Sequence, residues 1–269
     1  MHGTPWARWA DLYELEMCVN REAWFSRYHP APPGSEPRRL VCFPHAGGSA
    51  SFYLPVSSAL QPDVEVIGVQ YPGRQERRTE QPVQDLHDLA DLAAEALAPM
   101  VDRRTAFFGH SMGAVVAYEV ALRLKRNHGV EPTRLFVSGR RAPSAHRPLP
   151  DPVHRRDDAG IVAELRRLAG THADLLADDE IVRMIMPAVR GDYRAIETYA
   201  PRPAPPLECP VTAFVGDRDP QVEIAEAEAW AGHTTGPFDI EVFPGGHFYL
   251  VAEGPAVIAG LRDRLGVPV

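Results

Sequence analysis

The hydrophobic positions of this chain follow two patterns, short apolar runs and longer stripes at helical spacing. The apolar runs, which we interpret as buried strands, are residues 39–43, 64–70, 106–108, 134–138, 210–215 and 238–243. The stripes predict helices at about residues 50–60, 84–100, 114–125 and 254–265. Strands that alternate with helices indicate an α/β protein with a mostly parallel central sheet flanked by helices.

One long region interrupts this alternation. Between about residues 140 and 206 the sequence contains no convincing strand. Its apolar positions predict two or three helices, at about 157–169, 178–186 and 187–199. Clusters of proline bracket the region at both ends. Because long insertions in compact domains are usually functional, we interpret it as a helical lid over the carboxyl edge of the sheet.

The first 38 residues differ from the rest of the chain. Trp6, Trp9, Tyr13 and Met17 fall at helical spacing, and the Pro-rich run PAPPGSEP follows at residues 30–37. The helix would either dock on its own domain or contact a partner. We therefore expect an appendage and linker over residues 1–38, and a catalytic domain with its lid over residues 39–269.

The strongest chemical signal is the motif G-H-S-M-G at residues 109–113, between a predicted strand and a predicted helix. In that context G-x-S-x-G forms a nucleophile elbow, whereas elsewhere it is an ordinary turn. Gly109 and Gly113 lack a Cβ, so the strand and the helix can approach closely. The helix directs its first N–H groups at Ser111, where negative charge develops during acyl transfer. His110 is expected to point into the packing between sheet and helix.

A nucleophilic serine needs a base and an orienting acid. In an α/β-hydrolase the acid and then the histidine follow the serine along the chain. His247 comes after the last predicted strand and follows two glycines, so we expect it to be the base. Asp217 and Asp219 both lie in the turn after the strand at 210–215. The Gly-x-x-Asp spacing favours Asp219 as the acid, with Asp217 bonding its own turn.

The oxyanion of an acyl-transfer intermediate needs two backbone N–H groups. One comes from the residue after the nucleophile, Met112, and the other from the loop after an early strand. That loop reads H-A-G-G at residues 45–48, and we expect Ala46 to supply the second donor. The alternative is a phosphate-binding loop, but the segment lacks both the Lys-Ser/Thr pair and the G-x-G-x-x-G spacing of such loops.

The composition of the chain argues against several classes of function. The chain has 269 residues, 45% of them hydrophobic, and a net charge of −8, which argues against an extended nucleic-acid surface and weakly against binding to anionic membranes. Cys18, Cys42 and Cys209 are far apart, so neither a disulfide framework nor a zinc site is indicated. No apolar run reaches the roughly 18 residues of a membrane span, and acidic residues stand where a signal peptide needs an apolar core. We expect a cytoplasmic protein.

Several spaced motifs together resemble the type II thioesterases that accompany modular polyketide and nonribosomal peptide synthases. These motifs are F-P-H-A-G-G-S-A at 43–50, Y-P-G-R at 71–74, G-H-S-M-G at 109–113 and G-G-H-F at 245–248. Residues of the last lid helix, Met186, Pro187, Arg190, Asp192, Tyr193, Glu197 and Tyr199, match as well. The resemblance runs from about Trp24 to the C-terminus and leaves out residues 1–23.

The resemblance implies an α/β-hydrolase that removes acyl groups from the phosphopantetheine arm of acyl or peptidyl carrier proteins, through an acyl-serine intermediate. It maps Ser111, Asp219 and His247 onto the catalytic triad, and Ala46 and Met112 onto the oxyanion hole. It implies no metal and no dissociable cofactor, and a carrier protein as partner. It indicates no oligomeric state.

The apolar side chains of the lid either line a chamber for the acyl chain or form part of an ordinary hydrophobic core. They are Leu165, Leu168, Leu175, Leu176, Ile181, Ile185 and Met186.

Three rival functions remain open from the residues alone. A small-molecule carboxylesterase uses the same triad, and so does an acyltransferase or macrocyclase with a water-poor pocket. A non-catalytic binding protein on a hydrolase scaffold usually lacks one triad member, whereas this chain has candidates for all three.

Overall fold

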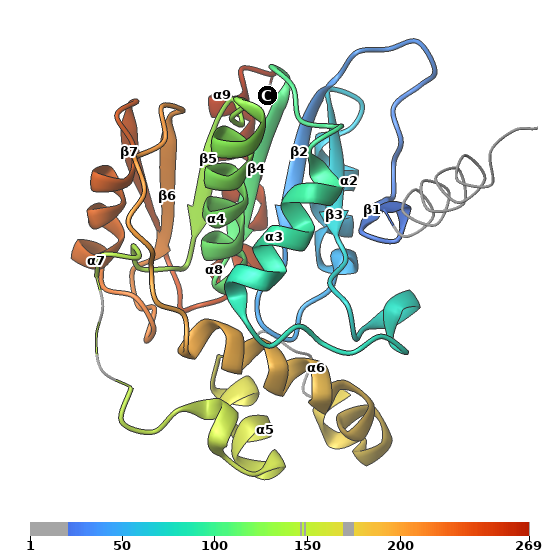
Figure 1. The fold of residues 1–269 in the computed structure, drawn as a ribbon, viewed down its shortest axis with the longest axis vertical. Coiled ribbons are helices and arrows are strands. Elements are labelled where there is room, and N and C mark those ends of the chain that lie inside the picture. The colour runs from blue at the N-terminus through green and yellow to red at the C-terminus, as the bar shows by residue number, and fades with distance from the viewer. Residues whose placement is uncertain (1–20, 146, 148, 169–174, 269) are drawn as a thin grey trace, which may run out of the picture.

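The computed structural model describes residues 21–145, 147, 149–168 and 175–268, so the predicted helix with Trp6 and Trp9 lies outside the described residues. Its centre is a seven-stranded sheet in the order β1-β3-β2-β4-β5-β6-β7 (Figure 1). The strands are β1 Phe25–Arg27, β2 Arg38–Phe43, β3 Val64–Val69, β4 Thr105–His110, β5 Leu135–Ser138, β6 Val211–Gly216 and β7 Phe238–Phe243. All neighbouring pairs are parallel except β1 with β3, which confirms the predicted α/β class.

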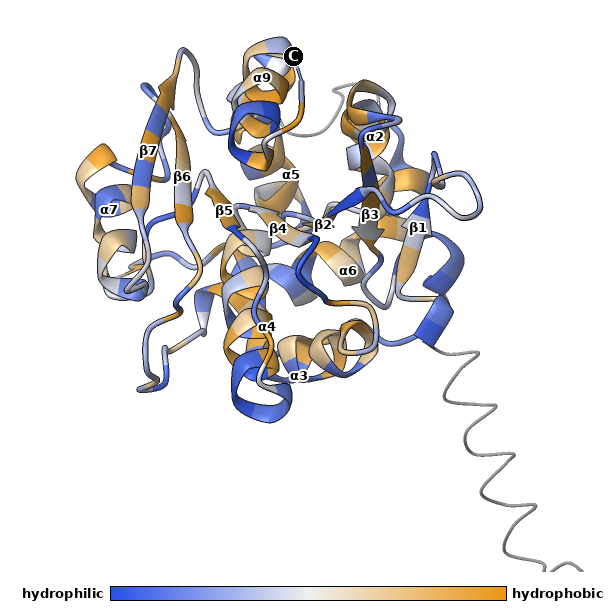
Figure 2. Cartoon of the chain, turned by 90° about the horizontal axis from the view of Figure 1, so that it is seen from above, coloured by the Kyte–Doolittle hydropathy of each residue, from blue (hydrophilic) through white to orange (hydrophobic). Residues whose placement is uncertain are grey.

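Helices cover both faces of the sheet, so its inner strands are buried on both sides. Val41 and Phe43 of β2 enter the core under one set of helices, and Leu40 and Cys42 enter the core under the other. Figure 2 shows the two layers from above, with α3 and α4 on one side and α2 and α9 on the other. The flanking helices are α2 Leu54–Leu60, α3 Leu86–Leu97, α4 Met112–His128, α7 Ile224–Glu228, α8 Tyr249–Ala252 and α9 Gly254–Leu265.

The predicted lid forms a separate layer beyond one end of the sheet (Figure 1). It contains α5 Asp158–Leu168 and α6 Asp179–Glu197. Its small core includes Ile161 and Leu165 of α5 and Val189 of α6. Gly47, in the loop that follows β2, donates its N–H to Asp192 of α6 at 2.8 Å, so the lid covers the carboxyl edge of the sheet, as expected.

The prediction of two lid helices divided at Pro187 was wrong, because α6 runs through that residue without interruption. A proline inside a helix removes one backbone hydrogen bond and costs about 3 kcal/mol. The buried positions Met186, Ala188 and Val189 surround the proline, and Asp192 is buried one turn later. Tertiary packing of this face therefore outweighs the local penalty.

The boundary expected between residues 38 and 39 also differs from the structure. Strand β1 pairs with β3 in antiparallel register, and the backbone oxygen of Trp24 accepts a hydrogen bond from Gln70 at 2.8 Å. The Trp24 ring is buried beneath the guanidinium of Arg77, 4.4 Å from the ring centroid. These residues thus belong to the sheet. A three-residue edge strand is too short to give an alternating pattern, which explains why the sequence did not indicate it.

Short 3₁₀ turns connect several of these elements. They are η1 Ala50–Tyr53, η2 Gln75–Arg77, η3 Val153–Arg155, η4 Leu175–Ala177 and η5 Ala229–His233. Across the described part of the chain, no helix combines the length and the apolar character needed to cross a membrane.

Candidate active site

Ser111 lies on a strained turn between β4 and α4. Its φ of 55° and ψ of −118° place a non-glycine residue in a region that L residues rarely adopt. A Cβ built on Gly109 would lie 2.1 Å from the Gly113 carbonyl oxygen, and one on Gly113 would lie 2.0 Å from the Phe43 carbonyl oxygen. Glycine is therefore required at both positions, because the backbone segments touch there. This contact holds Ser111 in its strained conformation.

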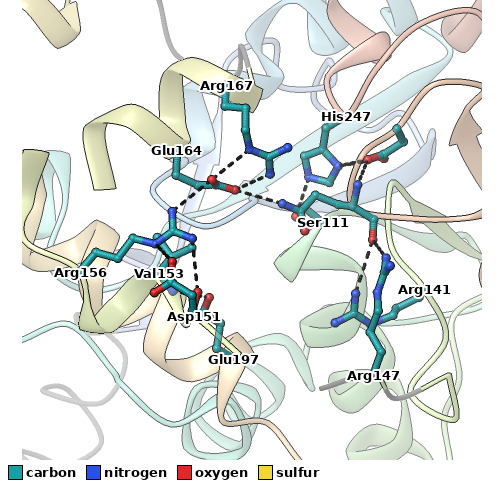
Figure 3. A network of polar contacts seen from close by, with 12 residues as sticks. Ser111, Arg141, Arg147, Asp151, Val153, Arg156, Glu164, Arg167, Glu197 and His247 are labelled. Carbon is teal, nitrogen blue, oxygen red and sulfur yellow. Dashed lines mark hydrogen bonds and ion pairs between the residues drawn. The ribbon is translucent and has the colours of Figure 1, made fainter. Parts of the chain in front are cut away.

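The structure brings the three predicted triad residues together (Figure 3). The Nε2 atom of His247 lies 2.9 Å from the Ser111 hydroxyl oxygen. The Nδ1 atom of the same ring lies 2.9 and 3.1 Å from the two carboxylate oxygens of Asp219. Because a carboxylate accepts the Nδ1–H, Nε2 is left as the acceptor for the serine hydroxyl. This tautomer is the one needed for His247 to act as a general base.

The two candidate aspartates have different partners. Asp219 contacts His247 and also accepts the backbone N–H of Gln221 at 2.8 Å. Asp217 accepts the backbone N–H of Gly245 at 2.7 Å and pairs with the exposed Arg218. Asp217 thus joins the two loops that carry the acid and the histidine, while Asp219 faces the ring.

Two further histidines flank the site, and both are buried. His110 donates to or accepts from Ser138 through Nδ1 at 2.9 Å, and its ring centroid lies 5.1 Å from that of His247. His45 packs edge to face against Phe248 at 4.8 Å. Burial, followed by the charge of His247, lowers the pKa of His45 to about 3 and lowers that of His110 well below its usual value. Both rings are therefore neutral at pH 7.

A buried ion pair ties the lid to the predicted oxyanion loop. Asp192 of α6 pairs with Arg74 through two bonds of 2.6 and 2.8 Å, and both side chains are at least nine-tenths buried. The same carboxylate accepts the N–H of Gly47, and Arg74 donates to the carbonyl of Gly48 at 3.0 Å. Ala46, next to these glycines, lines the cavity beside Ser111.

The position of Met112 also fits its predicted role as an oxyanion donor. Met112 is the first residue of α4, so its N–H belongs to the helix terminus that faces the elbow. The donor roles of Ala46 and Met112 stay predictions. Sequence reasoning noticed Y-P-G-R and Asp192 separately but did not pair them, since nothing local links residues 118 positions apart.

A cavity of about 460 Å³ opens between the lid and the carboxyl edge of the sheet, with Ser111 and His247 in its wall. Of the lid side chains predicted to line a chamber, Leu165 and Leu168 do so. Leu176 and Met186 are instead buried in the lid's own core. The Leu175 side chain lies outside the described residues.

A polar chain that the sequence did not indicate connects α5 to the triad (Figure 3). Glu164 of α5 accepts two bonds from Arg167, of 2.6 and 3.0 Å, and these lower the pKa of its carboxyl group. It also accepts the side-chain amide of Gln221 at 3.1 Å, and the backbone N–H of Gln221 binds Asp219. The position of the lid is thereby coupled to the acid of the triad.

Comparisons with known proteins agree with this geometry. A family model described as thioesterase domain matches residues 38–265. The probable cadicidin biosynthesis thioesterase of Streptomyces griseus is 55% identical over 242 residues, which are 90% of this chain and 66% of that protein, so the chain spans about two thirds of its length. Thioesterase PikA5 of Streptomyces venezuelae is 48% identical over 92% of this chain and 87% of its own. The structure of the type II thioesterase BorB from the borrelidin biosynthetic cluster superimposes with a TM-score of 0.84 at 47% identity, covering 91% of this chain and 98% of BorB.

Replacing Asp192 with asparagine is expected to disturb the oxyanion loop. The change leaves the Arg74 cation buried without its counter-charge, which costs about 3–5 kcal/mol of stability. It also loosens the loop beside Ala46, so kcat should fall about 100-fold, as when one oxyanion donor is lost. Urea unfolding and kcat for an activated thioester measure the two effects, and a folded Asp192→Asn protein with unchanged kcat would contradict the role.

Two controls separate stability from positioning. Asp179 is exposed on the same helix, so Asp179→Asn should leave kcat unchanged. The double variant Arg74→Met with Asp192→Leu removes both charges and should recover much of the stability. It still lacks the acceptor for the Gly47 N–H, so its kcat should stay low.

The buried neutral histidines predict a specific pH dependence of stability. The unfolded chain binds protons at His45 and His110 near pH 6.5, whereas the folded chain does not. Stability is therefore full above pH 6.5 and falls as the pH drops toward 3, by up to about 1.4 kcal/mol per pH unit for each histidine. Urea unfolding between pH 7 and pH 4.5 should show a smaller slope in His45→Gln than in the exposed control His128→Gln. Equal slopes would exclude His45 as a source of the effect.

Proposed function

The chain belongs to the thioesterase domain family, and we propose that it hydrolyses acyl thioesters held on the phosphopantetheine arm of acyl or peptidyl carrier proteins in polyketide or nonribosomal peptide biosynthesis. The observation that carries this proposal is the Ser111–His247–Asp219 chain of hydrogen bonds in the wall of a 460 Å³ cavity. The relatives are described as thioesterases, two of them of named biosynthetic routes, which supports a thioester as the substrate. We propose that the hydrolysis clears aberrant chains or releases a product.

The first half of the reaction forms an acyl-enzyme. His247 Nε2 takes the hydroxyl proton as Ser111 attacks the thioester carbonyl carbon. The carbonyl oxygen becomes an oxyanion, which the backbone N–H groups of Ala46 and Met112 stabilise. The carbon–sulfur bond then breaks, and His247 returns its proton to the pantetheine sulfur. The acyl group remains on Ser111 as an ester.

The second half releases the acid. His247 Nε2 takes a proton from water, which attacks the ester carbonyl, and the proton then passes to the Ser111 oxygen as the ester breaks. Asp219 keeps the Nδ1–H tautomer and stabilises the imidazolium in both halves. We propose that no metal or dissociable cofactor takes part, since the phosphopantetheine arrives as part of the substrate.

The character of the cavity favours hydrolysis over acyl transfer to an organic acceptor. Its wall contains seven charged side chains, Arg140, Arg141, Asp151, Arg156, Glu164, Arg167 and Glu197. Such a wall retains water, whereas an acyltransferase or macrocyclase must exclude it. A small-molecule carboxylesterase remains the alternative that the triad alone does not separate.

Triad variants give the first test. Ser111→Ala and His247→Ala should each lower kcat at least about 10⁴-fold without unfolding the protein, since each removes a reacting group. Asp219→Asn should lower kcat about 10³–10⁴-fold by favouring the wrong tautomer. Asp217→Asn keeps an acceptor for Gly245 and should cost less than 10-fold. Steady-state kinetics and circular dichroism measure these effects, and the reverse ranking of the two aspartates would move the acid to Asp217.

A matched substrate panel tests the substrate class. Short, branched and medium acyl groups would each be offered on a carrier protein, on a soluble pantetheine thiol and as an oxygen ester. The proposal predicts the highest kcat/KM for the carrier-bound thioesters, with the acyl profile distinguishing clearance of aberrant chains from product release. Equal turnover of oxygen esters, with no gain from the carrier, would make the protein a general esterase.

A further inference from the structure

The charged side chains in the cavity wall are unevenly paired. The carboxylate of Glu164 is held by Arg167 and lies 3.4 Å from Arg156, which also pairs with Asp151 at 2.9 Å (Figure 3). The wall carries four arginines and three carboxylates, so one positive charge is in excess.

The third carboxylate, that of Glu197, already has hydrogen-bond donors around it. It accepts the backbone N–H groups of Val153 and His154 at 2.8 and 3.0 Å and the His154 ring at 2.6 Å. Among the described residues, none of its hydrogen-bond partners is an arginine. The excess positive charge therefore lies with the arginines that follow β5.

Of the four arginines in the cavity wall, Arg140 is the one whose side chain has no partner among the described residues. No ion pair or side-chain hydrogen bond reaches it there, and its Nε atom is buried without an acceptor. Burial, with the charge of Arg141 second, lowers the pKa of Arg140 to about 9, so the guanidinium is still cationic at pH 7. Arg140 as a whole is half-buried, but its Nε–H is buried without an acceptor, which costs free energy that a bound oxygen would recover.

The backbone places Arg140 beside the nucleophile. It follows Gly139 at the carboxyl end of β5, and the N–H of Ser111 binds the carbonyl of Ser138 at 2.8 Å. Its own carbonyl accepts the Trp230 indole N–H at 2.9 Å, which fixes the chain at this point. Arg140 and Ser111 line the same cavity.

We propose that Arg140 binds an oxygen acceptor on the acyl chain, so that the enzyme prefers acyl groups bearing a carboxylate or carbonyl oxygen a few atoms beyond the thioester. This inference rests on the proposed thioester hydrolysis and adds a substrate class to it. A guanidinium binds a carboxylate through two parallel bonds and a ketone through one, so the carboxylate is the preferred group. An acyl chain with no oxygen beyond the thioester would leave the cation unpaired.

Three thioesters of equal shape test the proposal. Each has the same three-methylene spacer and ends in a carboxylate, a methyl ketone or an isopropyl group. All are made on N-acetylcysteamine, which carries no phosphate. The wild-type enzyme should show the highest kcat/KM for the carboxylate, then the ketone, then the isopropyl chain. In Arg140→Met the preference for the carboxylate over the isopropyl chain should fall about 10- to 100-fold, the value of a hydrogen bond to a charged group.

Matched variants exclude a general structural effect. Arg140→Lys keeps the charge and should retain part of the preference for the carboxylate but not for the ketone. Arg155 is an exposed lid arginine outside the cavity wall, so Arg155→Met should leave the ratio unchanged. The rate at which a fluorophosphonate labels Ser111 should be similar in all four proteins, which shows that the triad is intact.

Other results would contradict either the role of Arg140 or the proposed function as a whole. A wild-type preference for the isopropyl chain, or a ratio that Arg140→Met leaves unchanged, would overturn the role of Arg140 while hydrolysis stands. The same three acyl groups would then be offered on phosphopantetheine. An equal loss for all three chains on that thiol, with none on N-acetylcysteamine, would place Arg140 on the phosphate and also overturn its role. If the wild-type enzyme hydrolyses none of the thioesters, on this thiol or on a carrier protein, the proposed function fails together with the inference.

Discussion

The site depends on a place where three stretches of backbone touch with no side chain between them. Gly109 at the end of β4 meets the first turn of α4 at Gly113, which in turn lies against the Phe43 carbonyl at the end of β2. Any Cβ at either glycine would overlap these carbonyls, and a close-packed interior offers no room to shift. The contact holds Ser111 at a positive φ, and it fixes the start of the loop that carries Ala46. The positions of Ser111 and of the predicted oxyanion loop are thus set by one packing contact.

Buried charges and apolar packing together attach the lid to this centre, since Ala195 and Ile196 of α6 enter the core that contains α3 and α4. Asp192 of α6 reaches Arg74 and Gly47, and Tyr199, just beyond α6, donates to Glu119 of α4 at 2.6 Å. Buried ion pairs add little net stability but tolerate only one geometry, because each unpaired partner would be costly. The lid is therefore held in a defined position over the cavity. The cavity in turn contains the remaining charges, among which Arg140 alone has no partner in the described residues.

The sequence predicted the elements whose signal is local. Strands buried on both faces, such as β4, give continuous apolar runs, and the glycines around Ser111 reveal the elbow by their spacing. The break at Pro187 was a wrong prediction because local propensity carries no information about the packing that compensates it. The pairs Arg74–Asp192 and Glu164–Gln221 join segments distant in the chain. Their residue types are ordinary for exposed positions, so only the fold shows that they meet.

The pairing of Arg74 with Asp192 also limits how such enzymes can exchange parts. One partner stands before α3 in the hydrolase body, and the other stands 118 positions later in the lid. A recombination event that brings in a foreign lid changes one half of the pair and keeps the other. A foreign lid therefore fits only a body that supplies an arginine for its aspartate. The fit of the lid to the hydrolase body thus depends in part on one arginine outside the lid.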